Sequence, residues 1–554
     1  MTRNLLTLSL LALSLPATLL AGSEVAPLRG IAIQTGGRTK PLDTFARETA
    51  RRVMGAKPFG LEGVQGLEPT EWVLAMLATP ERWRGEPIVK VTHAGLRKAA
   101  GLPDDQDHYS FEELVSHEGF LAATEKVHAK LRQDEEIDPV ESELANLYDT
   151  LSIMSGIMSG EALRIIPHAD DPKATWYSIA DLDKPQVPQA QRVRALLSAL
   201  ISAYVAGDRA GVETASAGLA SRLAAIAPGV YPAEKDLALE VHYNRAKPFR
   251  TAWILYLLGF LALIASFPLA STVVSRVGMA LVVGGFVMNA YGMALRTMIS
   301  GRPPVTNMYE TLVFVAWGGV LFALIFEAIY KVRYFAATAA GLGTLCLILA
   351  DNVPILDGAI APLVPVLRDN MWLTVHVLTI TLGYAAFTLA MGLGHLNLGL
   401  YFFAPGRAAL LKSLSLFLYR ALQVGTLFLA VGTLLGGVWA SYSWGRFWGW
   451  DPKETWALIA LLGYLAILHG RFVGWIKDFG LAVGSILGYL LVLMAWYGVN
   501  FVLGTGLHSY GFGSGGYTYI GGFVLFEVGV IAAALLRRRM ELQKQTAAAA
   551  QPAH

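Results

Sequence analysis

The chain has 554 residues, of which 54% are hydrophobic and 16% are charged, and its net charge at neutral pH is only +2. It is therefore more apolar than an ordinary soluble protein. So small a net charge, without a long basic run, argues against a nucleic-acid partner. The one cysteine, Cys346, excludes a disulfide, a zinc–cysteine cluster and dithiol chemistry within a single chain. Thiol chemistry that involves this protein would use the thiols of other molecules.

The first 23 residues have the pattern of an export signal. Arg3 provides a positive start, an apolar run extends from Leu5 to Leu20, and small residues follow at Ala21-Gly-Ser23. The run is shorter than the roughly twenty residues that a spanning helix requires. We predict a cleaved signal peptide over 1–23, with an uncleaved anchor as the alternative. Either would send the following residues to the outer side of the membrane.

Residues 24–250 carry most of the charge and are predicted to form a mainly helical extracytoplasmic soluble domain. Residues 31–47 predict a short strand, a Gly-Gly turn and a helix from about Leu42. Composition predicts further helices and possible short strands. The helices are expected at 109–129, 139–158 and 191–226, and the strands at 87–91 and 175–179.

Residues 251–537 predict a transmembrane domain, followed by a cytoplasmic tail at 538–554. The apolar segments are each near the roughly twenty residues that cross a bilayer. We therefore expect an all-α polytopic membrane protein with about nine transmembrane helices and an N-terminal, mainly helical soluble domain on the outer side. The predicted spans are 251–270, 277–298, 310–330, 334–350, 371–393, 417–438, 454–474, 480–502 and 519–536.

The orientation follows from basic residues in short loops, which gather on the cytoplasmic side. All of these residues fall on one side of the predicted bundle: Arg276, Lys331, Arg333, Arg407, Lys412, Arg471, Lys477 and Arg537-Arg-Arg539. The opposite, outer side receives the soluble domain and the loop that precedes the seventh span.

That loop, Trp444–Trp456, holds four of the thirteen tryptophans, namely Trp444, Trp448, Trp450 and Trp456. Tryptophan can anchor a helix end at a membrane interface. So many rings with glycines between them favour a platform for a large, flat, apolar ligand. The run Asp451-Pro-Lys-Glu454 also predicts a capped helix start, in which both carboxylates accept from backbone amides.

Two histidines, His376 and His508, are predicted near the depth of this loop. They could ligate one iron from opposite faces of a macrocycle, or act as interfacial hydrogen-bonding groups. His469 and His395 are predicted deeper in the membrane, where polar groups usually face a cavity or a partner. The tryptophan loop and the outer pair together favour haem ligation.

At this point the chain resembles a known family. The tryptophan loop is similar to the signature of haem-handling cytochrome c biogenesis proteins, and its surroundings over 251–537 are similar to the CcsA (ResC) branch of system II. The segment Gly36–Phe45 resembles a soluble stretch found in some fused CcsB–CcsA proteins. The matching pieces are Ser300–Thr311, Trp372-Leu-Thr-Val-His376-Val, Leu468-His469-Gly-Arg471 and Leu507-His508-Ser509.

The resemblance implies a protein of a bacterial cytoplasmic (inner) membrane that moves haem b to the periplasmic face. It implies a holocytochrome c synthase component that attaches haem to the Cys-x-x-Cys-His motif of apocytochrome c. The expected partners are a CcsB (ResB) type membrane subunit, apocytochrome c and thiol reductant proteins. A haem transporter or chaperone without synthase activity is the main alternative, and a quinone- or lipid-binding module is a remoter one.

The resemblance also implies roles for residues. His376 and His508 match two outer haem ligands, and His469 matches an intramembrane ligand whose second partner comes from CcsB. His395 is an alternative second ligand within this chain, whereas Asn289 stands where some relatives have a histidine. The haem-binding loop is expected to comprise Trp444, Trp448, Trp450, Asp451 and Trp456. Candidate partners for the haem propionates are Arg302, Arg446 and Lys453.

Overall fold

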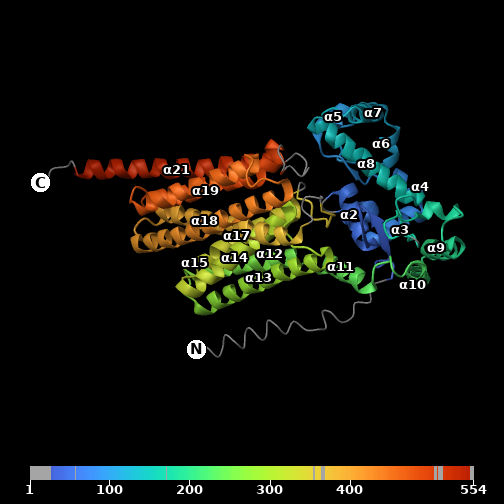
Figure 1. Cartoon of the computed structure of the whole chain (residues 1–554), viewed down its shortest axis with the longest axis horizontal. Helices are drawn as coiled ribbons and strands as arrows, with labels where there is room; N and C mark the ends of the chain where they lie inside the picture. The colour runs from blue at the N-terminus through green and yellow to red at the C-terminus, as the bar shows by residue number, and fades with distance from the viewer. Residues whose placement is uncertain are drawn as a thin grey trace. The chain divides into compact units, whose positions relative to one another are not determined.

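The structure, a computed structural model, describes residues 27–55, 58–169, 171–353, 356–363, 369–504, 508 and 516–549. The chain divides into two compact units, Met1–Arg245 and Ala246–His554, whose elements are labelled in Figure 1. The predicted signal segment, residues 1–23, lies outside the described residues.

The first unit is mainly helical, as predicted. Residues Gly36 and Gly37, with φ of 58° and 78°, form the turn that joins two short antiparallel strands. The strands and α-helices are β1 (Ala32–Thr35), β2 (Arg38–Pro41), α2 (Leu42–Met54), α3 (Pro69–Ala78), α4 (Pro80–Gly85), β3 (Val89–Lys90), α5 (Ala94–Ala100), β4 (His108–Tyr109), α6 (Phe111–Ser116), α7 (Glu118–Arg132), α8 (Pro139–Ser159), α9 (Ala190–Val205), α10 (Arg209–Ile226) and α11 (Glu234–Ala246). Short 3-10 turns lie at Pro58–Gly60, Glu62–Val64 and Ile179–Asp183.

Two helices that the sequence predicts as continuous are interrupted in the structure of this unit. The helix expected at 191–226 is interrupted at Gly207, which adopts a φ of 71°, and Asp208 then caps the next helix by accepting from the Gly211 amide at 3.0 Å. The helix expected at 109–129 begins as a strand and breaks at His117, whose side chain caps α7. The strand expected at 175–179 is reduced to one isolated bridge between Ile166 and Tyr177.

Polar and charged groups tie the Gly36–Phe45 segment to α11 and to the first turns of α2. Arg38 forms a two-pronged ion pair with Glu240, with contacts of 2.6 and 2.8 Å. Asn244 donates to the Asp43 carboxylate at 3.0 Å, and Lys40 pairs with Glu48 at 2.5 Å. Burial raises the pKa of the Glu48 carboxyl above its ordinary value, although Lys40 and Arg38 oppose that shift.

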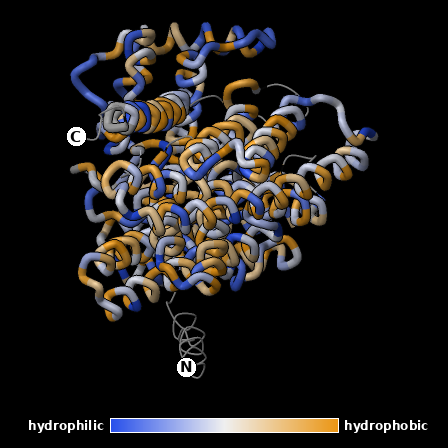
Figure 2. The backbone as a smooth tube through the Cα atoms, turned by 90° about the vertical axis from the view of Figure 1, so that its left-hand side faces the viewer, coloured by the Kyte–Doolittle hydropathy of each residue, from blue (hydrophilic) through white to orange (hydrophobic). Residues whose placement is uncertain are grey.

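The second unit is a helical bundle. Among the described residues, nine helices are long and apolar enough to cross a membrane, which confirms the predicted spans. Figure 2 shows hydrophobic residues recurring along these helices. The helices are α12 (Pro248–Ser266), α13 (Thr272–Ser300), α14 (Met308–Tyr330), α15 (Tyr334–Asn352), α16 (Asn370–Trp372), η6 (Leu373–Val377), α17 (Leu378–Phe403), α18 (Ala408–Trp444), α19 (Pro452–Phe472), α20 (Asp478–Leu493), η7 (Met494–Leu503) and α21 (Tyr517–Ala549).

Small residues allow the helices of the bundle to pack closely. A Cβ added to Gly259, Gly278 or Gly285 would meet the facing helix of the α12–α13 pair at 2.8, 2.9 and 2.6 Å. The span formed by η6 and α17 is the most extensively buried of the nine, and it contacts α14, α18 and α20. α21 is the least buried span and lies at the edge of the bundle (Figure 1). The middle of α17, from Thr381 to Leu398, is thus held inside the bundle.

Candidate functional site

An open cavity lies among the helix ends of the second unit. The empty space inside it, open solvent at the mouth included, is about 1200 Å³, and most of its lining is apolar. The walls come from the start of α14, from η6 and α17, from the end of α18, from the start of α19 and from η7, together with His508.

Two π-helical segments border this cavity. The segment Leu373–Val377 carries His376, and the segment Met494–Leu503 carries Trp496 and Asn500. Single π-helical turns interrupt an α-helix at a cost and are frequent at functional sites. Both segments here reach the same cavity from different helices.

His376 is held by helix α18. Its Nδ1 lies 2.8 Å from the carbonyl oxygen of Gly432. A carbonyl can only accept, so Nδ1 carries the proton and Nε2 carries the lone pair that a metal would use. The ring also packs against Trp439, with ring centroids 5.7 Å apart. Gly436 leaves room for the ring, because a Cβ there would lie 2.7 Å from its Cε1 atom.

His508 lines the same cavity and is held by the tryptophan loop. Its Nδ1 lies 2.9 Å from Oδ1 of Asp451, and its ring meets Trp444 edge-on at 4.8 Å. The carboxylate accepts a hydrogen bond from Nδ1–H, which favours the tautomer with the lone pair on Nε2. A carboxylate behind a histidine is the usual way to orient a metal ligand.

The loop itself begins α19 as its sequence predicts. Asp451 accepts from the Lys453 amide at 2.9 Å, and Glu454 accepts from the amides of Asp451 and Gly449 at 3.2 and 2.7 Å. Arg446 forms an ion pair with Glu454 at 2.9 Å. The capping box is confirmed, and Asp451 in addition orients His508.

The predicted tryptophans divide into two groups. Trp444 and Trp448 line the cavity, whereas Trp450 and Trp456 do not. Trp450 has a φ of 57° and is 70% exposed, and it meets Trp448 edge-on with ring centroids 5.9 Å apart. Trp450 therefore projects outward beside Trp448, which lines the cavity.

The two deeper histidines lie apart from the cavity. His469 is exposed on α19, and its Nδ1 contacts the Leu465 carbonyl oxygen at 2.7 Å. Both ring nitrogens of His395 are engaged, with Glu527 at 2.8 Å and with the Met391 carbonyl oxygen at 2.9 Å. Neither histidine is among the described residues that line the cavity.

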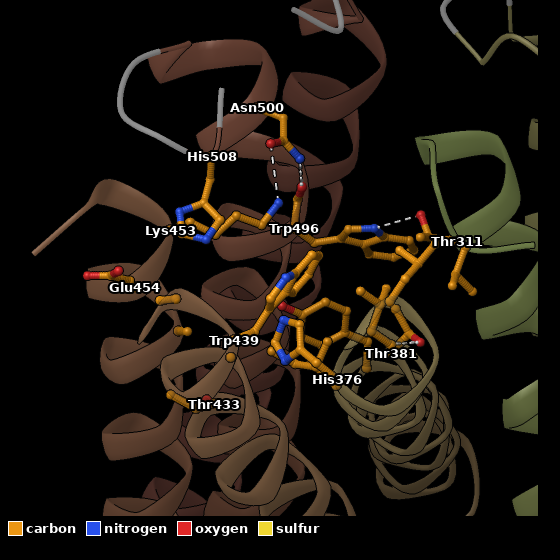
Figure 3. Close-up of a pocket in the computed structure, with 18 of the residues that line it drawn as sticks. Thr311, His376, Thr381, Thr433, Trp439, Lys453, Glu454, Trp496, Asn500 and His508 are labelled. Atoms are coloured by element: carbon orange, nitrogen blue, oxygen red, sulfur yellow. Dashed lines mark hydrogen bonds between the residues drawn. The ribbon is translucent and has the colours of Figure 1, made fainter. Parts of the chain in front are cut away.

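Several cavity residues are not found by sequence reasoning. Figure 3 shows Trp439 beside His376 and Trp496 across the cavity. Trp496 donates from Nε1 to Thr311 Oγ1 at 3.0 Å, and Asn500 donates to the Trp496 carbonyl oxygen at 2.9 Å. In the sequence, the four-residue spacing of Trp496 and Asn500 is the only sign that the two residues are neighbours, and this spacing does not predict a π-helix.

A buried ion pair supports the wall that α14 contributes. Arg296 and Glu310, with side chains only 1% and 2% exposed, meet at 2.6 Å. Arg296 also donates to the Gly358 carbonyl oxygen at 2.8 Å, while Glu310 accepts from the amide of Thr306 at 2.9 Å. Asn289, in α13, is fully buried and does not line the cavity.

The fold and the cavity define a multi-pass membrane protein with an aromatic-lined cavity at one end of its helices. Residues 305–508 match the family described as "Cytochrome C assembly protein", and this range begins and ends with residues that line the cavity. The chain belongs to this family, as its resemblance predicted.

Similarity to individual proteins supports the same assignment. The chain is 34% identical over 303 residues to "Cytochrome c biogenesis protein CcsA" of Synechococcus sp. (strain CC9902), which covers 48% of this chain and 98% of that protein. It is 31% identical over 496 residues to "Protein NrfI" of Wolinella succinogenes, which covers 86% of this chain. The chain spans 53% of NrfI, about half of its length.

Proposed function

We propose that the cavity binds haem b as its substrate and presents it for covalent attachment to apocytochrome c. The observation that carries this proposal is the pairing of His376 and His508. Both line one aromatic cavity and both have Nδ1 engaged by an acceptor of the protein. Two imidazoles with Nε2 as the basic nitrogen, set among tryptophans, suit an iron held in a large planar ring. Membership of the cytochrome c assembly family supports the same substrate.

In the proposed reaction the protein binds the haem, orients it and shields its iron. Trp444 and Trp448 would pack against the flat faces of the ring, and the histidines would hold its iron. Each substrate cysteine then adds across a vinyl double bond: a carbon–sulfur bond forms, the thiol proton goes to the other vinyl carbon, and no electron is gained or lost. Orientation within the cavity supplies the rate advantage, while the haem and thiols supply the chemistry.

We further propose that His469 serves a second haem site made with a partner. An ionisable side chain in a membrane helix is costly unless it faces a cavity, the interface or a partner group. His469 is exposed in the last turn of α19, where a partner subunit could reach it. A CcsB (ResB) type subunit that provides the second ligand would complete the site. Both ring nitrogens of His395 already have partners within the protein, so His395 is a weaker candidate for the second ligand.

The proposed orientation places the cavity, the tryptophan loop and the first unit on the periplasmic side of a bacterial inner membrane. It rests on the basic loops, which follow the positive-inside tendency. Fusion of a reporter enzyme after Lys412 and after Ser443 would test it. An active cytoplasmic reporter at the first position and an active periplasmic reporter at the second are expected, and the reverse pattern would contradict the orientation.

Co-expression with a c-type apocytochrome and a CcsB-type subunit tests the function. Covalent haem on the cytochrome is expected with the unaltered chain, and a loss of about 100-fold or more is expected for a His376→Ala, His508→Ala double variant, because the template for the reaction is removed. Haem in the purified membrane protein without any covalent product would instead favour a haem chaperone. Purified protein without a Soret band would exclude both haem functions.

A further inference from the structure

One cationic side chain enters the cavity from the start of α19. Lys453 follows Asp451 and Pro452, and its amide donates to the Asp451 carboxylate at 2.9 Å. This cap fixes the first turn of the helix, from which the lysine side chain leaves the backbone. Figure 3 shows that side chain beside His508 and extending toward Asn500. No other lysine or arginine lines the described part of the cavity.

The Lys453 ammonium meets a neutral acceptor. Its Nζ donates to Oδ1 of Asn500 at 3.2 Å, and within the described residues it forms no ion pair with a carboxylate. The nearest acidic residues along the chain also serve other groups. Asp451 holds His508, and Glu454 pairs with Arg446 and accepts from two loop amides.

The other two cations named as candidates do not reach the cavity. Arg446 pairs with Glu454, and Arg302 donates to the carbonyl oxygen of Ala361 at 2.8 Å. Neither residue lines the cavity, whereas Lys453 does. The sequence alone cannot separate these three residues, because all lie in loops or helix ends on the same side.

An ammonium carries three donors, and Asn500 uses one of them. A charge placed among aromatic walls is costly unless an opposite charge meets it. The amide of Asn500 is itself held, because it donates to the Trp496 carbonyl oxygen at 2.9 Å. Lys453 is therefore a positioned cation with donors available to an anionic group of a cavity ligand.

We propose that Lys453, supported by Asn500, forms a subsite for a carboxylate group carried by the flat ligand. This inference rests on the proposed haem-binding function and specifies its substrate class: a tetrapyrrole with a free propionate, preferred over the same ring with esterified side chains. The subsite also selects how the ring is turned in the cavity, since the edge that bears the carboxylate must face Lys453.

The test uses the full chain, purified in detergent, with iron protoporphyrin IX and its dimethyl ester as the two probes. The unaltered protein is expected to bind the diacid about tenfold more tightly than the ester, because a hydrogen-bonded charge pair is lost with the ester. Lys453→Met should abolish this preference by weakening the diacid alone. Lys453→Arg should retain it. Lys412→Met, which removes an exposed lysine at the start of α18, should behave as the unaltered protein does.

Asn500→Asp provides a second variant of nearly equal shape. It places a carboxylate against the ammonium, so it should lower diacid affinity and leave ester affinity unchanged. Ester binding also reports that each variant is folded. Equal binding of diacid and ester by the unaltered protein, or a preference that survives in Lys453→Met, would overturn the subsite.

The two proposals fail in different ways. If neither probe gives a Soret change that depends on His376 and His508, the haem-binding function fails. If both probes bind through these histidines with equal affinity, the function stands and the carboxylate subsite is wrong.

Discussion

The contact between Gly436 and His376 yields a sharp prediction. In Gly436→Ala the new Cβ would lie 2.7 Å from Cε1 of the imidazole and 3.2 Å from its Nδ1. Carbon atoms in contact lie about 3.5–4.0 Å apart, so the ring must withdraw by about 1 Å. The carbonyl oxygen of Gly432, which accepts the 2.8 Å hydrogen bond from Nδ1, belongs to the same helix face as Gly436. Withdrawal of the ring from this face therefore breaks the hydrogen bond.

Haem affinity should consequently fall about 10–100-fold, the range found when the support of a metal-ligating histidine is removed. Stability should change little, because alanine gains about 1 kcal/mol over glycine in a helix and overpacking costs about 1–3 kcal/mol. Haem titration followed at the Soret band, with thermal unfolding in parallel, measures both. Gly399→Ala, where an added Cβ meets nothing within 4 Å, is the matched control. Unchanged haem affinity and an unchanged spectrum in Gly436→Ala would refute the assigned position of His376.

Two further substitutions probe the groups behind the cavity walls. Asp451→Asn keeps the helix cap, since asparagine caps about as well as aspartate, but it removes the carboxylate behind His508. Haem titration should show a loss of haem affinity of about 10–100-fold. A variant that loses stability but keeps its haem affinity would contradict this role. Glu310→Ala leaves the buried Arg296 without its 2.6 Å partner and should destabilise the protein by about 3–5 kcal/mol. Denaturant unfolding should show a smaller loss when Arg296→Met is added, and a single variant as stable as the unaltered protein would contradict the argument.

The sequence predicts the membrane helices well, because each span is a local run of mainly apolar residues. It predicts their ends less well. The span expected at 417–438 is the helix Ala408–Trp444, since α18 continues past its apolar centre with polar residues at both ends. Helix breaks in the first unit depend on single residues such as Gly207, whose left-handed φ is not forced by its neighbours.

The candidate site was predictable in its outline only. The position of His376 near the start of its span, and of His508 after the eighth span, indicates that both are near the tryptophan loop. Both line the cavity with Trp444 and Trp448. Side-chain direction within an irregular loop has no period, so the outward turn of Trp450 could not be read from the sequence. The contact of Asp451 with His508 joins residues 57 positions apart, and local capping rules carry no information about it.

The π-helical segment Leu373–Val377 also restricts how the chain can change length during evolution. A π turn differs from an α turn by about one extra residue. Deleting one residue there would restore regular α-helix and rotate His376 by about 100° relative to the buried part of α17. This stretch joins α16 directly to α17, and it cannot lose a residue without turning the imidazole away from the cavity. Aligned relatives that share the site should therefore show no gap between His376 and the core of this helix.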